Sequence, residues 1–248
     1  MSELKPVSPF ATERILLPVL RMRTLVRVAA ALTSLALVFV LWVKLSEPGL
    51  ATLPPLQNGD IVFESARSDQ ALAILLATRS LYTHTGIVEK DADGSLYVIQ
   101  AAQVVMKTPL AAWIRQSYGE RITIMRLPGL SASAGAQVVA TAAKLEGRPY
   151  DYFFRLAPDQ IYCSELVYDA YLFGAHIQLG RLQPIGSLGI DNFAVQKIIS
   201  MRWRLDPDCQ AQGARDFAAC FAIIKRRPII TPVSLARDGR LEIIYSNY

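Results

Sequence analysis

The side chains best suited to covalent chemistry in this 248-residue chain are three cysteines and two histidines. Cys163 lies where a polar loop passes into an amphipathic stretch, which predicts that its thiol sits in the first turn of a helix. Unpaired backbone N–H groups and the helix dipole at such a position stabilise a thiolate and can hold an oxyanion. The sequence therefore indicates Cys163 as a candidate nucleophile, with a buried structural thiol as the alternative.

Only one histidine is placed to serve as the base for this thiol. His176 follows Cys163 by thirteen residues, and a helix between them would separate the two by roughly 15–20 Å. His84 lies on a separate predicted strand and is free to meet Cys163 in the fold. Gln100 lies on the strand expected to pair with that of His84, and its amide could orient the imidazole. The pattern predicts a Cys163–His84–Gln100 site, although a structural His and a merely polar Gln are the ordinary alternatives.

The other two cysteines are close in sequence and are expected to pair. Cys209 and Cys220 flank a polar, loop-like stretch, and a disulfide between them leaves Cys163 as the odd, free thiol. Two ordinary buried thiols are the alternative. Because the histidines and cysteines are dispersed along the chain, no metal site and no cofactor are expected.

Strands and helices alternate along the part of the chain that must position these residues. We expect Ser68 and Ser133 to cap two of the helices and Gly147 to stop the second. Helices flanking consecutive strands predict an α+β domain. The expected strands cover 60–64, 83–89, 96–102 and 121–127, and the expected helices cover 68–78, 109–116, 133–146, 163–174 and a short segment near 232–237.

The N-terminal segment decides the compartment. Residues 28–43 carry no charge, and with the preceding apolar residues they approach the ~20 residues that a membrane-spanning helix needs. Arginines precede this stretch, so the positive-inside rule places the chain that follows it outside the cytoplasm. We expect a basic cytoplasmic leader over 1–24, a transmembrane anchor over 25–45, a linker over 46–58 and a folded domain over 59–248. A cleaved signal peptide and a buried core helix are the alternatives.

The net charge of +5 reflects this leader more than the folded domain. Residues 1–27 hold five basic and two acidic side chains, which leaves a charge of only +2 on the rest of the chain. A nucleic-acid partner would need a clustered basic face, so none is expected.

Several short motifs, in this order and spacing, resemble a known family. They are 59–63 (GDIVF), 82–88 (YTHTGIV), 107–110 (KTPL) followed by Trp113, 147–151 (GRPYD) and 162–167 (YCSELV). Together they are similar to the permuted NlpC-type, papain-like cysteine hydrolases of the YaeF/YiiX branch, over about residues 57–190. The C-terminal residues 245–248 (YSNY) fit the same branch.

The resemblance implies a circularly permuted papain-like fold for the domain 59–248, in which the His strand precedes the Cys helix. The family's nucleophile falls on Cys163 and its base on His84. The third polar residue of the family, commonly Glu, falls on Gln100, which is a departure. A neutral amide can orient a histidine but stabilises an imidazolium less than a carboxylate does.

The resulting hypothesis is a membrane-anchored amidase or peptidase on the periplasmic face of the inner membrane. Its substrate would be a cell-wall peptide or a lipid-linked amide. An acyltransferase or lipid-ester hydrolase that uses the same cysteine is one alternative. A non-catalytic envelope protein that uses the fold for binding is another.

Overall fold

A computed structural model describes residues 26–39 and 52–248, and the chain divides into two compact units, 1–47 and 48–248. In the first unit residues 26–39 are helical. The rest of the predicted anchor 25–45, and the predicted leader 1–24, lie outside the described residues. Within the described ranges, no helix is both long and apolar enough to cross a membrane.

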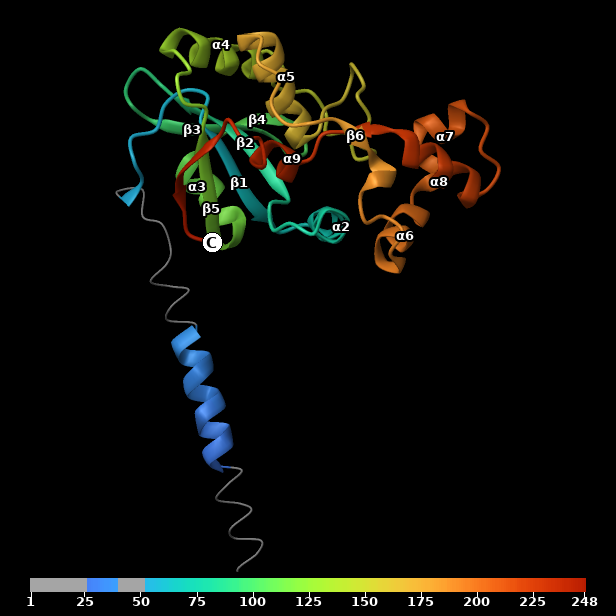
Figure 1. The fold of residues 1–248 in the computed structure, drawn as a ribbon, viewed down its shortest axis with the longest axis horizontal. Helices are drawn as coiled ribbons and strands as arrows, with labels where there is room; N and C mark the ends of the chain where they lie inside the picture. Colours follow the sequence, from blue (N-terminus) through green and yellow to red (C-terminus); the bar gives the residue numbers. More distant parts are fainter. Residues whose placement is uncertain (1–25, 40–51) are drawn as a thin grey trace, which may run out of the picture. The chain divides into compact units, whose positions relative to one another are not determined.

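The second unit is built on a six-stranded antiparallel sheet in the order β4-β3-β2-β1-β5-β8 (Figure 1). Four of these strands match the predicted ones to within a few residues, whereas β4 and β8 were not located by the sequence. The strands are β1 (Ile61–Ala66), β2 (His84–Lys90), β3 (Leu96–Ala101), β4 (Val105–Pro109), β5 (Ser117–Arg126) and β8 (Glu242–Ser246). Two further short strands, β6 (Gln183–Pro184) and β7 (Pro228–Ile229), pair with each other.

Helices pack around this sheet, and Figure 1 shows α4 and α5 together along one side of it, with α6, α7 and α8 grouped beyond α2. The five predicted helices are present, and α6 to α8 were not anticipated. The helices are α2 (Asp69–Thr78), α3 (Leu110–Gln116), α4 (Ala132–Ala143), α5 (Cys163–Ala175), α6 (Phe193–Ser200), α7 (Pro207–Ala211), α8 (Phe217–Arg226) and α9 (Pro232–Ala236).

The capping predictions hold for α2 but were wrong for α4. Ser68 caps α2 by accepting from the Ala71 N–H, as expected. At α4 the cap is Ser131 instead of Ser133, because Ser131 has an extended backbone and its hydroxyl accepts from the N–H three residues on. Gly147 does not end the helix. Its N–H bonds to the carbonyl of Val105, so the chain has already turned towards β4.

The two faces of the sheet carry separate hydrophobic clusters, as the period of two along each strand requires. One face packs on α4 and α5, and the other packs on α3. The first cluster includes Ile61, Phe63, Ile87, Ile99, Val138, Leu166 and Tyr171. The second includes Val62, Val88, Val98, Leu110 and Trp113, together with Leu56 from the predicted linker.

The predicted disulfide is confirmed. Cys209 of α7 is bonded to Cys220 of α8, with a Cα–Cα distance of 5.1 Å, and Cys163 is a free, buried thiol. Close by, Arg227 forms a buried ion pair with Asp206 at 2.7 Å. The bridge and the ion pair tie the C-terminal helices together.

Removing this bridge should destabilise the domain. The loop it closes is short, and the chain-entropy model gives about 3 kcal/mol for a bridge of this kind. For a domain of this size we expect a Cys209→Ala/Cys220→Ala variant to unfold about 6–12 °C below the unaltered protein in a thermal scan. Reduction of the unaltered protein should lower its melting temperature similarly. Peptide mapping without reductant that linked Cys163 to either partner would contradict the pairing.

Candidate active site

Cys163 is the first residue of α5, and the backbone before it is fixed from two sides. Tyr162 is extended, and its N–H donates to Glu165 Oε2 at 3.2 Å. The hydroxyl of Tyr162 accepts from the Ile230 N–H at 3.1 Å, and Ser164 Oγ donates to the Ile230 carbonyl at 3.0 Å. The first turn of α5 is thereby anchored to the segment before α9, which sets the direction of the Cys163 side chain.

Glu165 would place a negative charge beside the thiol if its carboxyl were ionised. Burial raises the pKa of Glu165 to about 9, against the opposing hydrogen bond from Tyr162. At neutral pH the carboxyl therefore stays protonated. It can still accept the Tyr162 N–H without repelling a thiolate at Cys163.

The structure brings His84 close enough to Cys163 that each side chain shifts the pKa of the other. Burial alone raises the pKa of the Cys163 thiol. The charge and hydrogen bond of His84, the hydroxyl of Tyr150 and the N–H of Thr85 act the other way, and the pKa is lowered overall. The Tyr150 hydroxyl donates to Cys163 Sγ at 3.9 Å. These contacts favour the thiolate.

His84 is the cationic partner of this pair. Burial lowers the pKa of its imidazole, but the adjacent thiolate, the carboxylate of Glu64 and the hydrogen bond to Gln100 raise it to about 9. The raised pKa of His84 and the lowered pKa of Cys163 both favour a thiolate–imidazolium pair. This is the reactive form of a cysteine nucleophile with its general acid already protonated.

Gln100 lies against the far side of the imidazole, as the sequence predicts. His84 Nε2 is 2.7 Å from Gln100 Oε1, and the same oxygen accepts from Trp113 Nε1 at 3.1 Å and Gln116 Nε2 at 3.2 Å. Gln100 Nε2 donates to Thr108 Oγ1 at 2.9 Å. Because the indole N–H can only donate, these contacts fix which end of the amide faces the ring. His84 therefore donates through Nε2–H, which leaves Nδ1 as the ring nitrogen available to the thiol.

The sequence did not assign a role to two other groups at this site. Tyr150 lies within the motif 147–151, and its backbone forms an isolated β-bridge with Ile161. Its hydroxyl contacts Cys163 Sγ. Glu64 ends the predicted first strand and is the Cα partner of His84 in the β1–β2 pair. A charged residue directly after the apolar run 61–63 was the signal that could have revealed it.

The other histidine does not belong to the site. His176 is the exposed C-cap of α5, at the opposite end of the helix from Cys163. In the part of the chain that the structure describes, no three His, Cys, Asp or Glu side chains cluster as metal ligands do. His84 Nε2 is moreover committed to Gln100, so the residues present do not fit a metal at this site.

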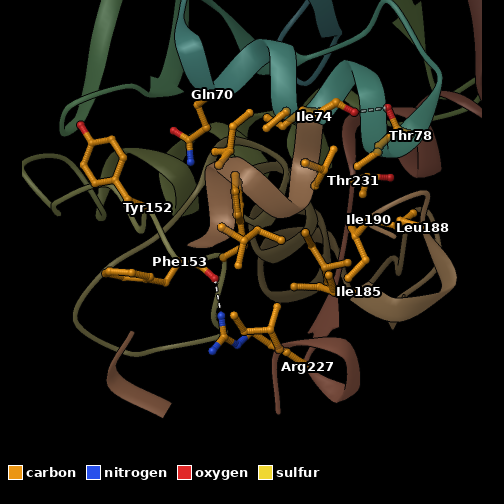
Figure 2. A pocket seen from close by; sticks show the side chains of 18 of the residues that line it. Gln70, Ile74, Thr78, Tyr152, Phe153, Ile185, Leu188, Ile190, Arg227 and Thr231 are labelled. Carbon is orange, nitrogen blue, oxygen red and sulfur yellow. Dashed lines mark hydrogen bonds between the residues drawn. The ribbon is translucent and has the colours of Figure 1, made fainter. Parts of the chain in front are cut away.

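A cavity of about 380 Å³ opens beside the nucleophile, with Cys163 and Ser164 in its wall. Figure 2 shows Ile74 of α2 on one side and Ile185 and Ile190 on the other. Most of the lining is aliphatic or aromatic. Arg227 reaches this wall, but its guanidinium donates to the Phe153 carbonyl at 2.6 Å and pairs with Asp206 and Asp208, so its charge is already satisfied.

A histidine strand that precedes a cysteine helix, with an amide behind the imidazole, defines a permuted papain-like cysteine hydrolase. A model of the family described as "Permuted papain-like amidase enzyme, YaeF/YiiX, C92 family" matches residues 55–245, and the chain belongs to this family. It is accordingly an enzyme of the papain-like cysteine amidase and peptidase class. The resemblance is confirmed, and the match extends beyond residue 190 to include β8.

Two proteins illustrate this relationship. The uncharacterized protein YiiX of Escherichia coli K12 is 33% identical over 165 residues, which cover 66% of this chain and 80% of that protein. The crystal structure of a protein described as metalloprotein yiiX, from Escherichia coli O157:H7, superposes with a TM-score of 0.68 at 28% identity. That match covers 78% of this chain and 98% of the other.

The ion pair predicts how Cys163 reacts with an alkylating agent. Iodoacetamide reacts with thiolate, and Cys163 is the free thiol of the described chain. Because His84 lowers its pKa, Cys163 should react at pH 6–7 at least tenfold faster in the unaltered protein than in a His84→Ala variant. His176→Ala is the matched control and should leave the pH profile unchanged. Identical profiles for the unaltered and His84→Ala proteins would contradict the pairing.

Proposed function

We propose that this enzyme is an amidase that cleaves an amide bond in a substrate bearing an apolar chain, through Cys163, His84 and Gln100. The observation that carries the proposal is the buried pair of Cys163 and His84, with Cys163 at the wall of an apolar cavity. The family supports amide hydrolysis, and the cavity supports the apolar substrate.

In the acylation step, Cys163 Sγ attacks the amide carbonyl carbon and a C–S bond forms. The carbonyl electrons move to oxygen, and the oxyanion can be held by backbone N–H groups at the start of α5 and by the Tyr150 hydroxyl. As the C–N bond breaks, His84 gives its Nδ1 proton to the leaving amine. The products of this step are a free amine, a thioester on Cys163 and a neutral His84.

In the second step, water attacks the thioester and His84 takes its proton. The C–S bond breaks, the carboxylic acid leaves, and the proton on His84 restores the pair with Cys163. Gln100 holds the ring with Nδ1 towards the sulfur throughout both steps. Since it orients the base without reacting, its loss should cost less activity than the loss of Cys163.

The cavity favours a lipid-linked amide over a cell-wall peptide. Its wall is mainly apolar, and the guanidinium of Arg227 is already paired with Asp206 and Asp208. Apart from Arg202, which also lines the cavity, a polar, charged peptide would meet few partners there to replace its lost hydration. An aliphatic chain would instead gain about 0.8 kcal/mol for each methylene group it buries.

A series of N-acyl amides of increasing chain length tests this proposal. Amine release should require Cys163 and should persist at a reduced rate in Gln100→Ala. The value of kcat/KM should rise about fourfold for each added methylene group until the cavity is filled. Ile198→Trp, which narrows the cavity, should abolish the gain for long chains. Phe193→Trp on the exposed face of the same helix is the matched control.

Other results of this series would change the proposed substrate or reaction. A rate independent of chain length, or faster release from a muropeptide than from any acyl amide, would overturn the apolar substrate. If added alcohols or amines captured the acyl group in preference to water, the enzyme would be an acyltransferase that uses the same thioester.

We further propose that an uncleaved helix over 25–45 anchors the enzyme, with the catalytic domain on the periplasmic side of the inner membrane. The uncharged stretch 28–43 and the arginines before it support this orientation. The disulfide between Cys209 and Cys220 supports an oxidising compartment for the domain.

This topology predicts the behaviour of a reporter fused after Tyr248. Alkaline phosphatase, which requires disulfides, should be active in the fusion because the C-terminus is expected outside the cytoplasm. Membrane fractionation of the same fusion should recover it in the membrane at full length. A reporter that worked only in the cytoplasm would contradict the orientation, and a mass that lacked the apolar stretch 28–43 would contradict the uncleaved anchor.

A further inference from the structure

Glu64 is a buried carboxylate directly across the sheet from His84. It is the Cα partner of His84 in the β1–β2 pair, and its side chain is 1% exposed. Its Oε2 atom has no hydrogen-bond partner among the residues that the structure describes. A carboxylate held this way is costly unless it interacts with a nearby cation. The larger of its two interactions with cationic groups is with His84, and the smaller is with Arg67.

Gln116 links Glu64 to the orienting amide on the other side of the imidazole. Its side chain lies close enough to Glu64 to lower the pKa of that carboxyl, and its Nε2 donates to Gln100 Oε1 at 3.2 Å. Gln100 is neutral, so it can hold the ring of His84 but cannot neutralise its charge. The orienting group and the negative charge are thus supplied by different residues on different strands.

We propose that Glu64 is the positioning residue that supplies the counter-charge to His84, and that it acts chiefly when the thioester is hydrolysed. This proposal rests on the proposed function of His84 as the base. Before acylation the Cys163 thiolate balances the imidazolium. Once Cys163 is acylated that negative charge is gone, and His84 must become cationic again as it takes the proton from water.

The ionisation of Glu64 gives this role a pH dependence. Burial raises its pKa to about 7, against the charge of His84, the hydrogen bond from Gln116 and the charge of Arg67. Tyr248 also faces Glu64, and burial raises the pKa of its hydroxyl, which stays neutral. Glu64 is therefore anionic above about pH 7, and deacylation should be fastest there.

Charge removal and charge transposition test the proposal. In Glu64→Gln, kcat towards an N-dodecanoyl p-nitroanilide should fall about 10- to 100-fold above pH 7. KM should fall with kcat because the acyl-enzyme accumulates, and an initial burst of nitroaniline should appear. The change of kcat with pH near pH 7 should be absent in Glu64→Gln. Glu89→Gln on β2, whose carboxylate pairs with Lys107, is the matched control and should behave as the unaltered protein.

The double variant Glu64→Gln/Gln100→Glu separates charge from shape. It returns a carboxylate to the imidazole from the opposite side, and it should recover most of the lost kcat. Iodoacetamide alkylation of Cys163 gives a second measurement that needs no turnover. Its midpoint should move to higher pH in Glu64→Gln, because a less stable imidazolium lowers the thiol pKa less.

The results can contradict the proposal in two ways. Unchanged kcat and alkylation profiles in Glu64→Gln would overturn it, as would a loss of kcat that the double variant fails to restore. Failure of the proposed function would give a different result from failure of the Glu64 proposal. Turnover would then survive in Cys163→Ala, while the Cys163 alkylation profiles of Glu64→Gln and the unaltered protein would still report on Glu64.

Discussion

The buried ion pair between Cys163 and His84 is the interaction on which the rest of the site depends. Two charges removed from water are unfavourable unless close partners replace the lost hydration. For the sulfur, these partners are the first turn of α5, the Thr85 N–H and the Tyr150 hydroxyl. For the imidazole, they are the Gln100 oxygen and the Glu64 carboxylate. Each contact is modest, and together they favour the charged forms of the thiol and the imidazole.

The sheet supplies the geometry that these partners need. β2 lies between β1 and β3, so His84 meets Glu64 on one side and Gln100 on the other. α5 packs on the opposite face from α3 and presents its N-terminus at the end of β2, where Thr85 can reach Cys163. A slip of one residue in β2 would turn His84 to the other face. The buried apolar side chains that fix the register therefore also hold the catalytic geometry.

How much the sequence predicts depends on whether the signal is local. Ser68, the apolar alternation of the strands and the thiol at a helix start are local patterns, and they gave α2, most of the sheet and the Cys163–His84–Gln100 arrangement. Ser131 and Ser133 offer equivalent caps in the sequence, and the backbone conformation that makes Ser131 the cap of α4 is not visible there. The cavity could not be predicted, because its walls come from α2, α6 and loops far apart in the chain.

Only one ionised carboxylate is expected beside the buried imidazole of His84, and this explains where the negative charge of the site lies. Two buried carboxylates flanking His84 would repel each other, and one would take up a proton and become neutral. With Glu64 on β1, the residue on β3 is better neutral, and an amide keeps the hydrogen bond to His84 without adding charge. Gln116 donates to Gln100 and lies near Glu64, so a neutral amide also stands between the two residues. Gln100 is therefore consistent with a working base, since the negative charge enters from the other neighbouring strand.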